Sequence, residues 1–193
     1  MKTSERVVRH PTIKNPVETL ANTRHEFGEH GGVNMSIEAS TTFTAMHPDI
    51  LTDMFHGDRG PDKGGCYLYG RHFNPTVYAL SRQLAALEGT ESAYCTASGM
   101  AAISGVLFQL CNAGDHIVSS NTVYGGTYAL MHDFLPLKSG IHTTLVDIND
   151  LDAVEAAITE KTRVLYTESI ANPTLRVADI PALADIAHRH GIK

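Results

Sequence analysis

Residues 92–128 set the architecture of the chain and read SAYCTASGMAAISGVLFQLCNAGDHIVSSNTVYGGTY. This stretch predicts a short strand at 92–96, then a helix that begins after Ser98 and runs through apolar residues to 110. A buried strand is predicted at 116–120 and a further helix at 125–135. Strands and helices that alternate at such short intervals are typical of βαβ units.

The alternation continues on both sides of this stretch. The sequence predicts strands at 142–147 and 163–168 and helices at 75–88, 150–158 and 180–190. Such a series indicates an α/β fold with a mainly parallel sheet that helices cover on both faces. Ile192 and Lys193 resemble the beginning of another strand. We therefore expect a truncated domain, whose sheet continues beyond Lys193.

The first 60 residues are organised differently. Glycines and polar residues interrupt short apolar runs, and only one short helix is predicted, near 49–54. A segment that cannot form its own core usually lies against the body of the protein or against a partner subunit. The sequence thus predicts two parts, an N-terminal arm at 1–60 and the first, incomplete part of a larger domain at 61–193.

Composition excludes several classes of function. The chain has 193 residues, with 15 Lys and Arg against 21 Asp and Glu, and a formal net charge of −6. No run of basic residues appears, which argues against nucleic-acid binding. No stretch is long and apolar enough for a membrane span, and the N-terminus lacks the apolar run of a secretion signal. Three cysteines, an odd number, indicate reduced thiols, so we expect a cytoplasmic protein.

The eleven histidines raise the question of a metal site. They are scattered, none belongs to an HExxH motif, and no two cysteines have CxxC spacing. The sequence therefore predicts no metal site.

Four segments carry candidate functional residues. Ser98, Gly99 and Met100 lie in a segment rich in small residues that begins a helix. Free N–H groups at a helix start suit a phosphate, although small residues also permit close strand–helix packing. Tyr124 precedes two glycines, so its ring is able to lie against a planar ligand or simply to pack beside a glycine turn. Asn172, beside Pro173, is suited either to holding a ligand oxygen or to capping its own turn.

The fourth segment is YLYGRHFNPT at 67–76. Arg71 offers a planar fork for a phosphate or carboxylate, with the Tyr69 hydroxyl close by in sequence, although a surface arginine is the simpler interpretation. Because these residues lie next to the arm, they are able to reach a site across a subunit interface.

Together and in this order, YGRHFNPT, the SGM turn, NTVYGGTY and ESIANPT resemble the Cys/Met-metabolism family of pyridoxal-phosphate (PLP) enzymes. The resemblance runs from about Thr23 to the last residue and is greatest to the plant-type methionine γ-lyases. It implies the fold of the PLP-dependent transferases, fold type I, resembling aspartate aminotransferase. It also implies a sulfur-containing amino acid as substrate, and a homotetramer built from dimers that share active sites.

The resemblance implies a role for each matching residue. Ser98, Gly99 and Met100 are expected to bind the PLP phosphate, and Tyr124 to stack on the pyridine ring and protonate the departing sulfur. Asn172 is expected beside the 3-oxygen of PLP, and Tyr69 and Arg71 at the phosphate bound by the neighbouring subunit. The implied reaction is γ-elimination of L-methionine to methanethiol, 2-oxobutanoate and ammonia.

Alternatives to this reaction remain open. Many bacterial methionine γ-lyases have a cysteine two residues after the stacking tyrosine, where this chain has Gly126. Glycine occurs there in the plant-type lyases and also in O-acetylhomoserine sulfhydrylases and cystathionine γ-synthases, so γ-replacement stays open, as does a cystathionine lyase. None of the lysines matches the Schiff-base lysine of the family. The aspartate that pairs with the pyridine nitrogen and the arginine for the substrate carboxylate are also expected outside this chain. The 193 residues alone are therefore expected to be an inactive fragment.

Overall fold

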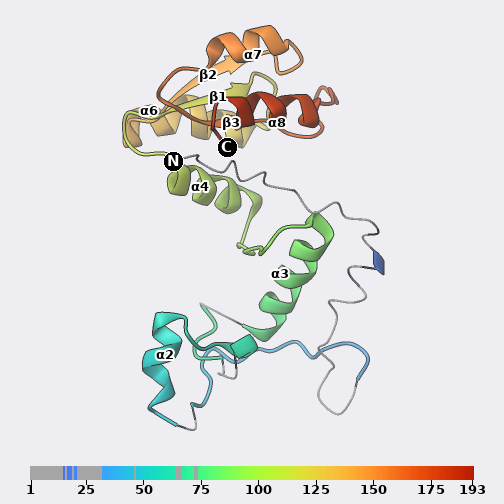
Figure 1. Cartoon of the computed structure of the whole chain (residues 1–193), viewed down its shortest axis with the longest axis vertical. Helices are drawn as coiled ribbons and strands as arrows, with labels where there is room; N and C mark the ends of the chain where they lie inside the picture. The colour runs from blue at the N-terminus through green and yellow to red at the C-terminus, as the bar shows by residue number, and fades with distance from the viewer. Residues whose placement is uncertain are drawn as a thin grey trace, which may run out of the picture. The chain divides into compact units, whose positions relative to one another are not determined.

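The computed structural model describes residues 15, 17–18, 20, 32–45, 47–63, 67–71 and 74–193. The chain divides into two compact units, Met1–Cys95 (unit 1) and Thr96–Lys193 (unit 2). Figure 1 shows the helices of unit 1 and the sheet of unit 2. Most of the predicted functional residues belong to unit 2. None of the helices in the described ranges is long and apolar enough to cross a bilayer.

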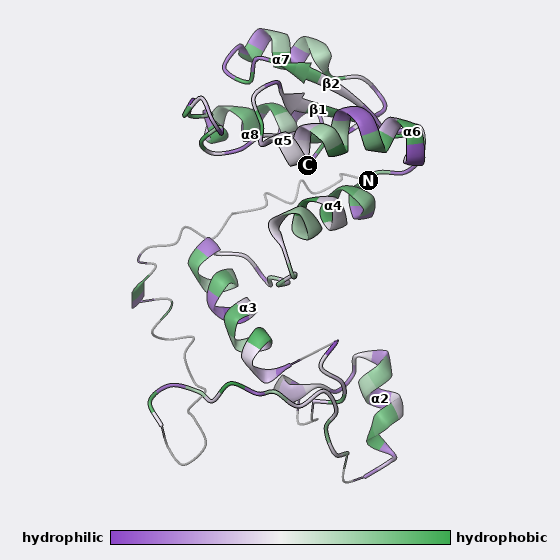
Figure 2. Cartoon of the chain, turned by 180° about the vertical axis from the view of Figure 1, so that it is seen from behind, coloured by the Kyte–Doolittle hydropathy of each residue, from purple (hydrophilic) through white to green (hydrophobic). Residues whose placement is uncertain are grey.

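Unit 1 is built around helix α3 (Pro75–Glu88). Asn74 caps its first turn by accepting the N–H groups of Thr76 and Val77, Pro75 occupies the first helical position, and Gly89 ends the helix with a φ of 65°. Apolar residues recur along α3 at three- and four-residue steps, and hydrophobic and hydrophilic bands alternate along its ribbon (Figure 2). The remaining elements described in this unit are α2 (Ile50–His56) and a short 3₁₀ turn, η2 (Pro61–Lys63).

The end of the predicted arm pairs with the residues that precede α3. Thr42 and Tyr69 form an antiparallel bridge, and the Gly70 N–H donates to Thr41 O at 2.8 Å. The side chain of Asn74 donates to Glu38 O at 2.9 Å. This part of the arm is therefore held against the body of unit 1, one of the two placements that the sequence suggested.

Unit 2 contains a parallel sheet of three strands in the order β2-β1-β3. The strands are β1 (His116–Ser120), β2 (His142–Val146) and β3 (Thr162–Tyr166). Lys193 extends the pairing, because its N–H donates to Arg163 O at 2.9 Å and its carbonyl accepts the Leu165 N–H at 2.8 Å. This pattern is that of a parallel neighbour of β3 and confirms that Lys193 lies in an extended, strand-like position.

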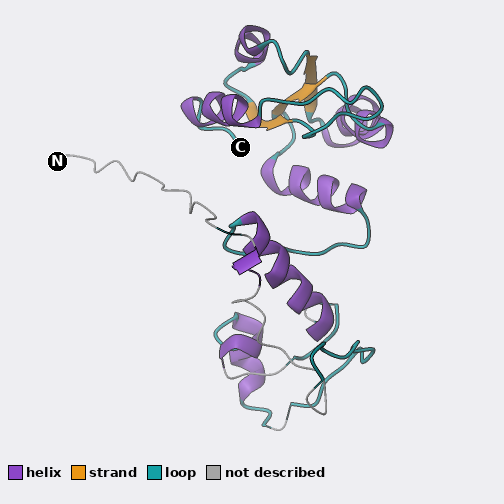
Figure 3. Ribbon diagram, turned by 90° about the vertical axis from the view of Figure 1, so that its right-hand side faces the viewer, coloured by secondary structure: helices purple, strands orange, loops and turns teal. Residues whose placement is uncertain are grey.

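Helices lie on both sides of this sheet (Figure 3). They are α4 (Gly99–Leu110), α5 (Gly125–Tyr128), the π-helical segment η3 (Ala129–Phe134), α6 (Leu135–Ser139), α7 (Leu151–Ala157) and α8 (Ile180–Arg189). One apolar cluster joins Leu107 of α4, Met131 of η3 and Leu135 of α6 to Ile117 of β1. A second cluster packs α7 and α8 against the other face. The α/β class with a parallel sheet is confirmed.

Two details differ from the sequence-based expectations. Residues 92–96 are not a strand, because they have no ladder partner among the described residues. The helix predicted at 125–135 extends through Ser139 as three consecutive segments, of which the middle one is π-helical. The wider π turn lies directly before Pro136, a residue that has no N–H to donate to a regular helix.

Candidate functional site

The carboxyl ends of the three strands lie at one edge of the sheet, where parallel α/β proteins usually bind their ligands. The chain leaves β1 at Asn121, whose N–H donates to Val146 O of β2 at 2.8 Å. It then reaches Tyr124, which immediately precedes α5. The chain leaves β3 at Thr167 and Glu168.

The amino end of α4 presents free backbone donors. The Ser98 hydroxyl oxygen accepts the Ala101 N–H at 3.1 Å, and the first bond within the helix runs from Ala102 N–H to Ser98 O. The N–H groups of Gly99 and Met100 precede that bond, so the helix itself cannot satisfy them. Ser98 and Gly99 are exposed, and a Cβ placed on Gly99 would meet no atom within 4 Å. The positive end of α4 at this point suits an anion.

Met100 and Tyr124 meet at Gly126. A Cβ placed on Gly126 would lie 2.7 Å from Cε1 of Tyr124 and 3.3 Å from Sδ of Met100. The next residue, Thr127, is fully buried, and its hydroxyl donates to Met100 Sδ at 3.8 Å. The structure thus brings the ring of Tyr124 and the first turn of α4 together, and the side chain of Tyr124 remains accessible, with 51% of the residue exposed.

Two residues of the β3 end hold this turn, and sequence reasoning gave neither of them a role. The Tyr124 N–H donates to Oε1 of Glu168 at 2.9 Å. The Tyr166 hydroxyl lies near the side chain of Thr127. Burial raises the pKa of Tyr166, while the side chain of Thr127 opposes that rise and the charge of Glu168 adds to it. The strand that the sequence predicted at 163–168 would place both on one face, but β3 ends at Tyr166, so strand spacing alone did not identify Glu168.

Asn172 lies in a small hairpin that follows β3. Ile170 and Val177 form an antiparallel bridge, and the peptide bond between Asn172 and Pro173 is cis. Arg176 ties this hairpin to the end of β2, because its Nη2 donates to both carboxylate oxygens of Asp147, at 2.8 and 2.9 Å. Asn172 is exposed, and in the described part of the chain no side-chain hydrogen bond joins it to Tyr124 or Ser98.

Tyr69 and Arg71 belong to unit 1. The guanidinium carbon of Arg71 lies 5.0 Å from the centre of the Tyr69 ring, so the two side chains form a cation–π pair. Gly70 between them lies against the arm, where a Cβ would make ordinary contact with Ser40 O at 3.4 Å. The two residues predicted to act together are therefore neighbours in space.

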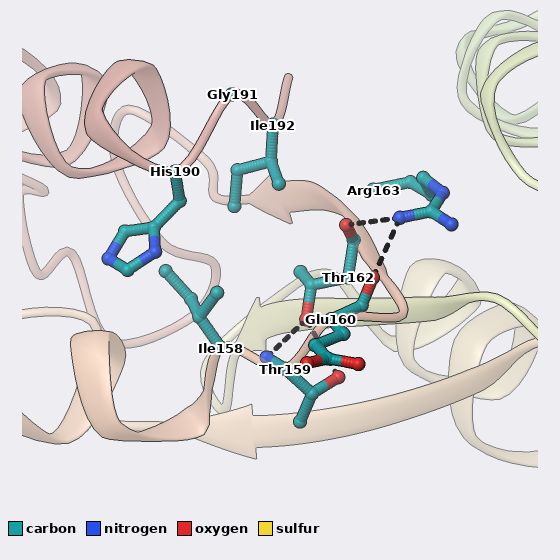
Figure 4. A pocket seen from close by; sticks show the side chains of 8 residues that line it. All are labelled: Ile158, Thr159, Glu160, Thr162, Arg163, His190, Gly191 and Ile192. Atoms are coloured by element: carbon teal, nitrogen blue, oxygen red, sulfur yellow. Dashed lines mark hydrogen bonds between the residues drawn. The ribbon is translucent and has the colours of Figure 1, made fainter.

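A cavity of about 630 Å³ lies elsewhere in unit 2, at the amino end of β3, between Ile158–Arg163 and the end of α8 (Figure 4). Its polar residues are bonded to one another: the Arg163 guanidinium donates to Glu160 O at 3.0 Å, and Thr162 Oγ1 accepts the Thr159 N–H at 2.8 Å. Figure 4 shows both bonds. We therefore assign this cavity no catalytic role.

The lysines in the described part of unit 2 do not lie at the carboxyl edge. Lys138 is near the end of α6, Lys161 immediately precedes β3, and Lys193 pairs beside Val164. Within the described ranges, no three His, Cys, Asp or Glu side chains gather in a way that could hold a metal ion.

The residues at the carboxyl edge fit the cofactor that the sequence resemblance implies. Pyridoxal phosphate has an anionic phosphate, which suits the free N–H groups of Gly99 and Met100, and a flat ring, which suits the exposed face of Tyr124. The chemistry of the donors is thus compatible with the cofactor.

Comparisons with known proteins agree with this geometry. The family described as Cys/Met metabolism PLP-dependent enzyme matches residues 18–193. The chain is 61% identical over 179 residues to methionine gamma-lyase of Arabidopsis thaliana, covering 92% of this chain and 40% of that protein. It is 38% identical over 164 residues to L-methionine gamma-lyase of Pseudomonas putida, covering 84% of this chain and 40% of that protein. The chain thus spans about 40% of the length of these curated relatives.

A solved structure shows that the similarity extends from the sequence to the fold. A putative O-acetylhomoserine (thiol)-lyase of Campylobacter jejuni, crystallised with N'-pyridoxyl-lysine-5'-monophosphate, superposes with a TM-score of 0.80 at 32% identity. The match covers 90% of this chain and 42% of that one. This likeness confirms the predicted fold, that of the fold type I PLP-dependent transferases. With the family match over nearly the whole chain and a site whose donors fit the cofactor, the chain belongs to the Cys/Met metabolism family of PLP-dependent enzymes.

Proposed function

We propose that the carboxyl edge of unit 2 is the PLP site of a lyase that cleaves L-methionine by γ-elimination. One methionine and one water give methanethiol, 2-oxobutanoate and ammonia. The observation that carries the proposal is the meeting of Met100 and Tyr124 at Gly126, since it sets an aromatic ring beside free helix-end donors. The name of the Arabidopsis relative, 61% identical to this chain, supports methionine as the substrate.

Ser98, Gly99 and Met100 bind the cofactor phosphate in this proposal. The N–H groups of Gly99 and Met100 donate to phosphate oxygens, and the dipole of α4 favours the negative charge. The Ser98 oxygen already accepts the Ala101 N–H, which leaves the hydroxyl hydrogen to donate to the same phosphate. The hydroxyl oxygen therefore caps the helix as an acceptor, while the hydroxyl hydrogen is available to donate to the phosphate.

Tyr124 has two tasks in this proposal. Its ring covers one face of the pyridine, and its hydroxyl gives a proton to the departing sulfur as the bond between the γ-carbon and sulfur breaks. When bound, PLP supplies the electron sink that stabilises negative charge beside the amino group of the substrate. The exposure of Tyr124 leaves room for a substrate to approach its hydroxyl.

The remaining predicted residues complete the proposal. Asn172 lies by the 3-oxygen of the cofactor, and Tyr69 and Arg71 reach the phosphate held by a neighbouring subunit. The cation–π pairing of Arg71 with Tyr69 supports their acting as one group. This arrangement requires a homo-oligomer with shared sites, for which we propose a tetramer of two such dimers. We also propose a cytoplasmic location, which the free thiols of Cys95 and Cys111 support.

The reaction is tested by offering the full-length protein three substrates separately. These are methionine, cystathionine, and O-acetylhomoserine with sulfide. We expect methanethiol and 2-oxobutanoate in equal amounts from methionine. The structural likeness to a putative O-acetylhomoserine (thiol)-lyase makes γ-replacement the second candidate. Homocysteine formed from O-acetylhomoserine and sulfide, without methanethiol from methionine, would establish that reaction instead.

The cofactor attachment is tested separately. The lysines described in unit 2 lie away from the carboxyl edge. We therefore expect borohydride reduction of the loaded full-length protein to attach the pyridoxyl group to none of Lys2, Lys14, Lys63, Lys138, Lys161 and Lys193. Peptide mass spectrometry locates the modified residue, and a pyridoxyl group on one of these six lysines would refute the expectation.

A further inference from the structure

The turn that carries Tyr124 has buried side chains on both flanks, Val123 and Thr127, but none at its centre. Two glycines follow Tyr124, and a Cβ placed on Gly125 would meet nothing within 4 Å. Tyr124 itself is half exposed. The backbone bond at residue 124 therefore helps to fix the position of the ring.

Both ends lie against the segment that ends β3. Glu168 accepts the Tyr124 N–H at 2.9 Å, and the Tyr166 hydroxyl lies near the side chain of Thr127. Tyr166 is the last residue of β3, and Glu168 follows two residues later. Tyr166 packs against the apolar cluster around Leu107 and Ile117, so its position is fixed by the core.

Glu168 is well suited to hold the Tyr124 end. An N–H that donates to a carboxylate forms a stronger bond than one between neutral groups. The bonded N–H also lies at the start of the helical run formed by α5, η3 and α6, where a negative charge is favoured. On the β3 side, the Ser169 carbonyl accepts the Ala178 N–H at 3.2 Å, which fixes the backbone next to Glu168.

We propose that Glu168 is a positioning residue, which holds the backbone of Tyr124 and so fixes the Tyr124 ring over the first turn of α4. The inference rests on the proposed function only in that the ring is taken to cover the cofactor. Glu168 donates no proton and binds no substrate in this role. Its effect on the reaction passes entirely through Tyr124.

The first test follows the backbone itself. In the full-length protein without cofactor, we expect Glu168→Ala to raise the deuterium exchange rate of the Tyr124 amide by roughly tenfold or more. Glu168→Gln keeps an oxygen acceptor at the same reach, so its exchange should stay within about threefold of the unaltered protein. Glu160→Gln, at the amino end of β3, is the matched control for loss of a glutamate charge. An unchanged Tyr124 amide in Glu168→Ala would refute the proposal.

The second test uses the loaded protein. Glu168→Ala should lower kcat by roughly tenfold while KM changes little, and should weaken the induced circular dichroism of the bound pyridine ring. Glu168→Gln should restore most of both signals, and equal losses in the two variants would overturn the positioning role. If the unaltered protein neither binds PLP nor releases methanethiol, the proposed function fails, whereas the exchange experiment still decides the role of Glu168.

Discussion

The ring of Tyr124 lies across Gly126, so that a Cβ at position 126 would stand only 2.7 Å from the ring carbon Cε1. Real side-chain contacts are not this short, and a side chain at this position therefore has to displace the ring. Met100 Sδ, 3.3 Å from the same point, also restricts the space there. The absence of a side chain at 126 is thus a condition for the contact between the ring and α4.

We predict that Gly126→Ala impairs the site more than the fold. Alanine in a helix gains about 1 kcal/mol over glycine, and overpacking costs about 1–3 kcal/mol when neighbours cannot move. Because the Tyr124 ring is half exposed, it turns aside, and we expect unfolding in urea to change by less than about 1 kcal/mol. Cofactor affinity should fall by roughly tenfold, measured by absorbance titration.

Gly125→Ala is the matched control for this change. The same methyl group at 125 would meet no atom within 4 Å, so the ring keeps its place. If both variants bind the cofactor equally well, the contact at Gly126 has no functional importance.

We predict that Tyr124→Phe keeps the cofactor and slows the reaction. Phenylalanine retains the flat ring and lacks the hydroxyl, so binding of PLP should remain within about threefold while turnover of methionine falls about a hundredfold. Tyr128→Phe serves as control, because Tyr128 lies one turn further along and stacks on His132, with ring centres 4.9 Å apart. Methanethiol release measured in both variants decides the matter, and undiminished turnover in Tyr124→Phe would remove its hydroxyl from the mechanism.

We predict that Ser98→Ala weakens both α4 and phosphate binding. Loss of the bond from the Ala101 N–H costs about 1 kcal/mol of stability, as N-cap substitutions usually do. Asp179→Ala removes the equivalent cap of α8, where Asp179 accepts the Ala182 N–H at 3.1 Å. The two variants should lose similar stability in urea, but only Ser98→Ala should weaken the binding of PLP. Equal cofactor affinity in both would refute a phosphate role for Ser98.

We predict that Arg176→Gln loosens the hairpin that carries Asn172. The pKa of Asp147 is lowered, first by the Asn149 N–H and then by the Arg176 guanidinium, so Asp147 remains charged and the pair persists until acidic pH. Without Arg176, deuterium exchange of residues 169–178 should rise, and KM for methionine should increase roughly tenfold. Arg189→Gln, which breaks the pair with Glu155 between α7 and α8, is the control. A KM that both variants leave unchanged would contradict the prediction.

We predict that His116 makes the fold sensitive to mild acid. Its ring bridges Thr162 and Thr144 at 2.8 Å each, and burial, aided by the charge of His142, lowers its pKa. The unfolded chain therefore takes up a proton near pH 6.5 that the folded chain resists. Stability from this residue is fully present above about pH 6.5 and is lost as pH falls towards the lowered pKa.

Urea unfolding between pH 5 and 8 checks this expectation. His116→Gln should flatten the dependence on pH, whereas His132→Gln, at an exposed position in η3, should keep it. Parallel curves for His116→Gln and the unaltered protein would show that His116 is not responsible.

Much of the fold of both units follows from local chemistry. The caps at Asn74, Ser98, Asp150 and Asp179 were readable because each uses a side chain within three residues of the helix that it begins. Residues 92–96 were predicted wrongly as a strand, because a strand exists only when a neighbour pairs with it. No local pattern reveals whether a neighbour is present.

The candidate site divides in the same way. Ser98 and Tyr124 were found because each directly precedes a helix, and such positions are marked by small or polar residues. The hydrogen bond from Tyr124 to Glu168 joins residues that are 44 apart in the sequence. Glu168 belongs to the ESIANPT motif, but the motif alone assigned it no role. Such a pairing depends on which strands become neighbours, and here β1 and β3 are adjacent although β2 lies between them in sequence.

The bridge that His116 makes has a practical consequence for engineering. One imidazole ties the first residues of β1 and β3 to the middle of β2, while the proposed chemistry occupies the carboxyl ends of the strands. Designers who wish to alter substrate preference can therefore randomise the loops around Tyr124 and Asn172, because the clamp that secures the scaffold is remote from every position they would change.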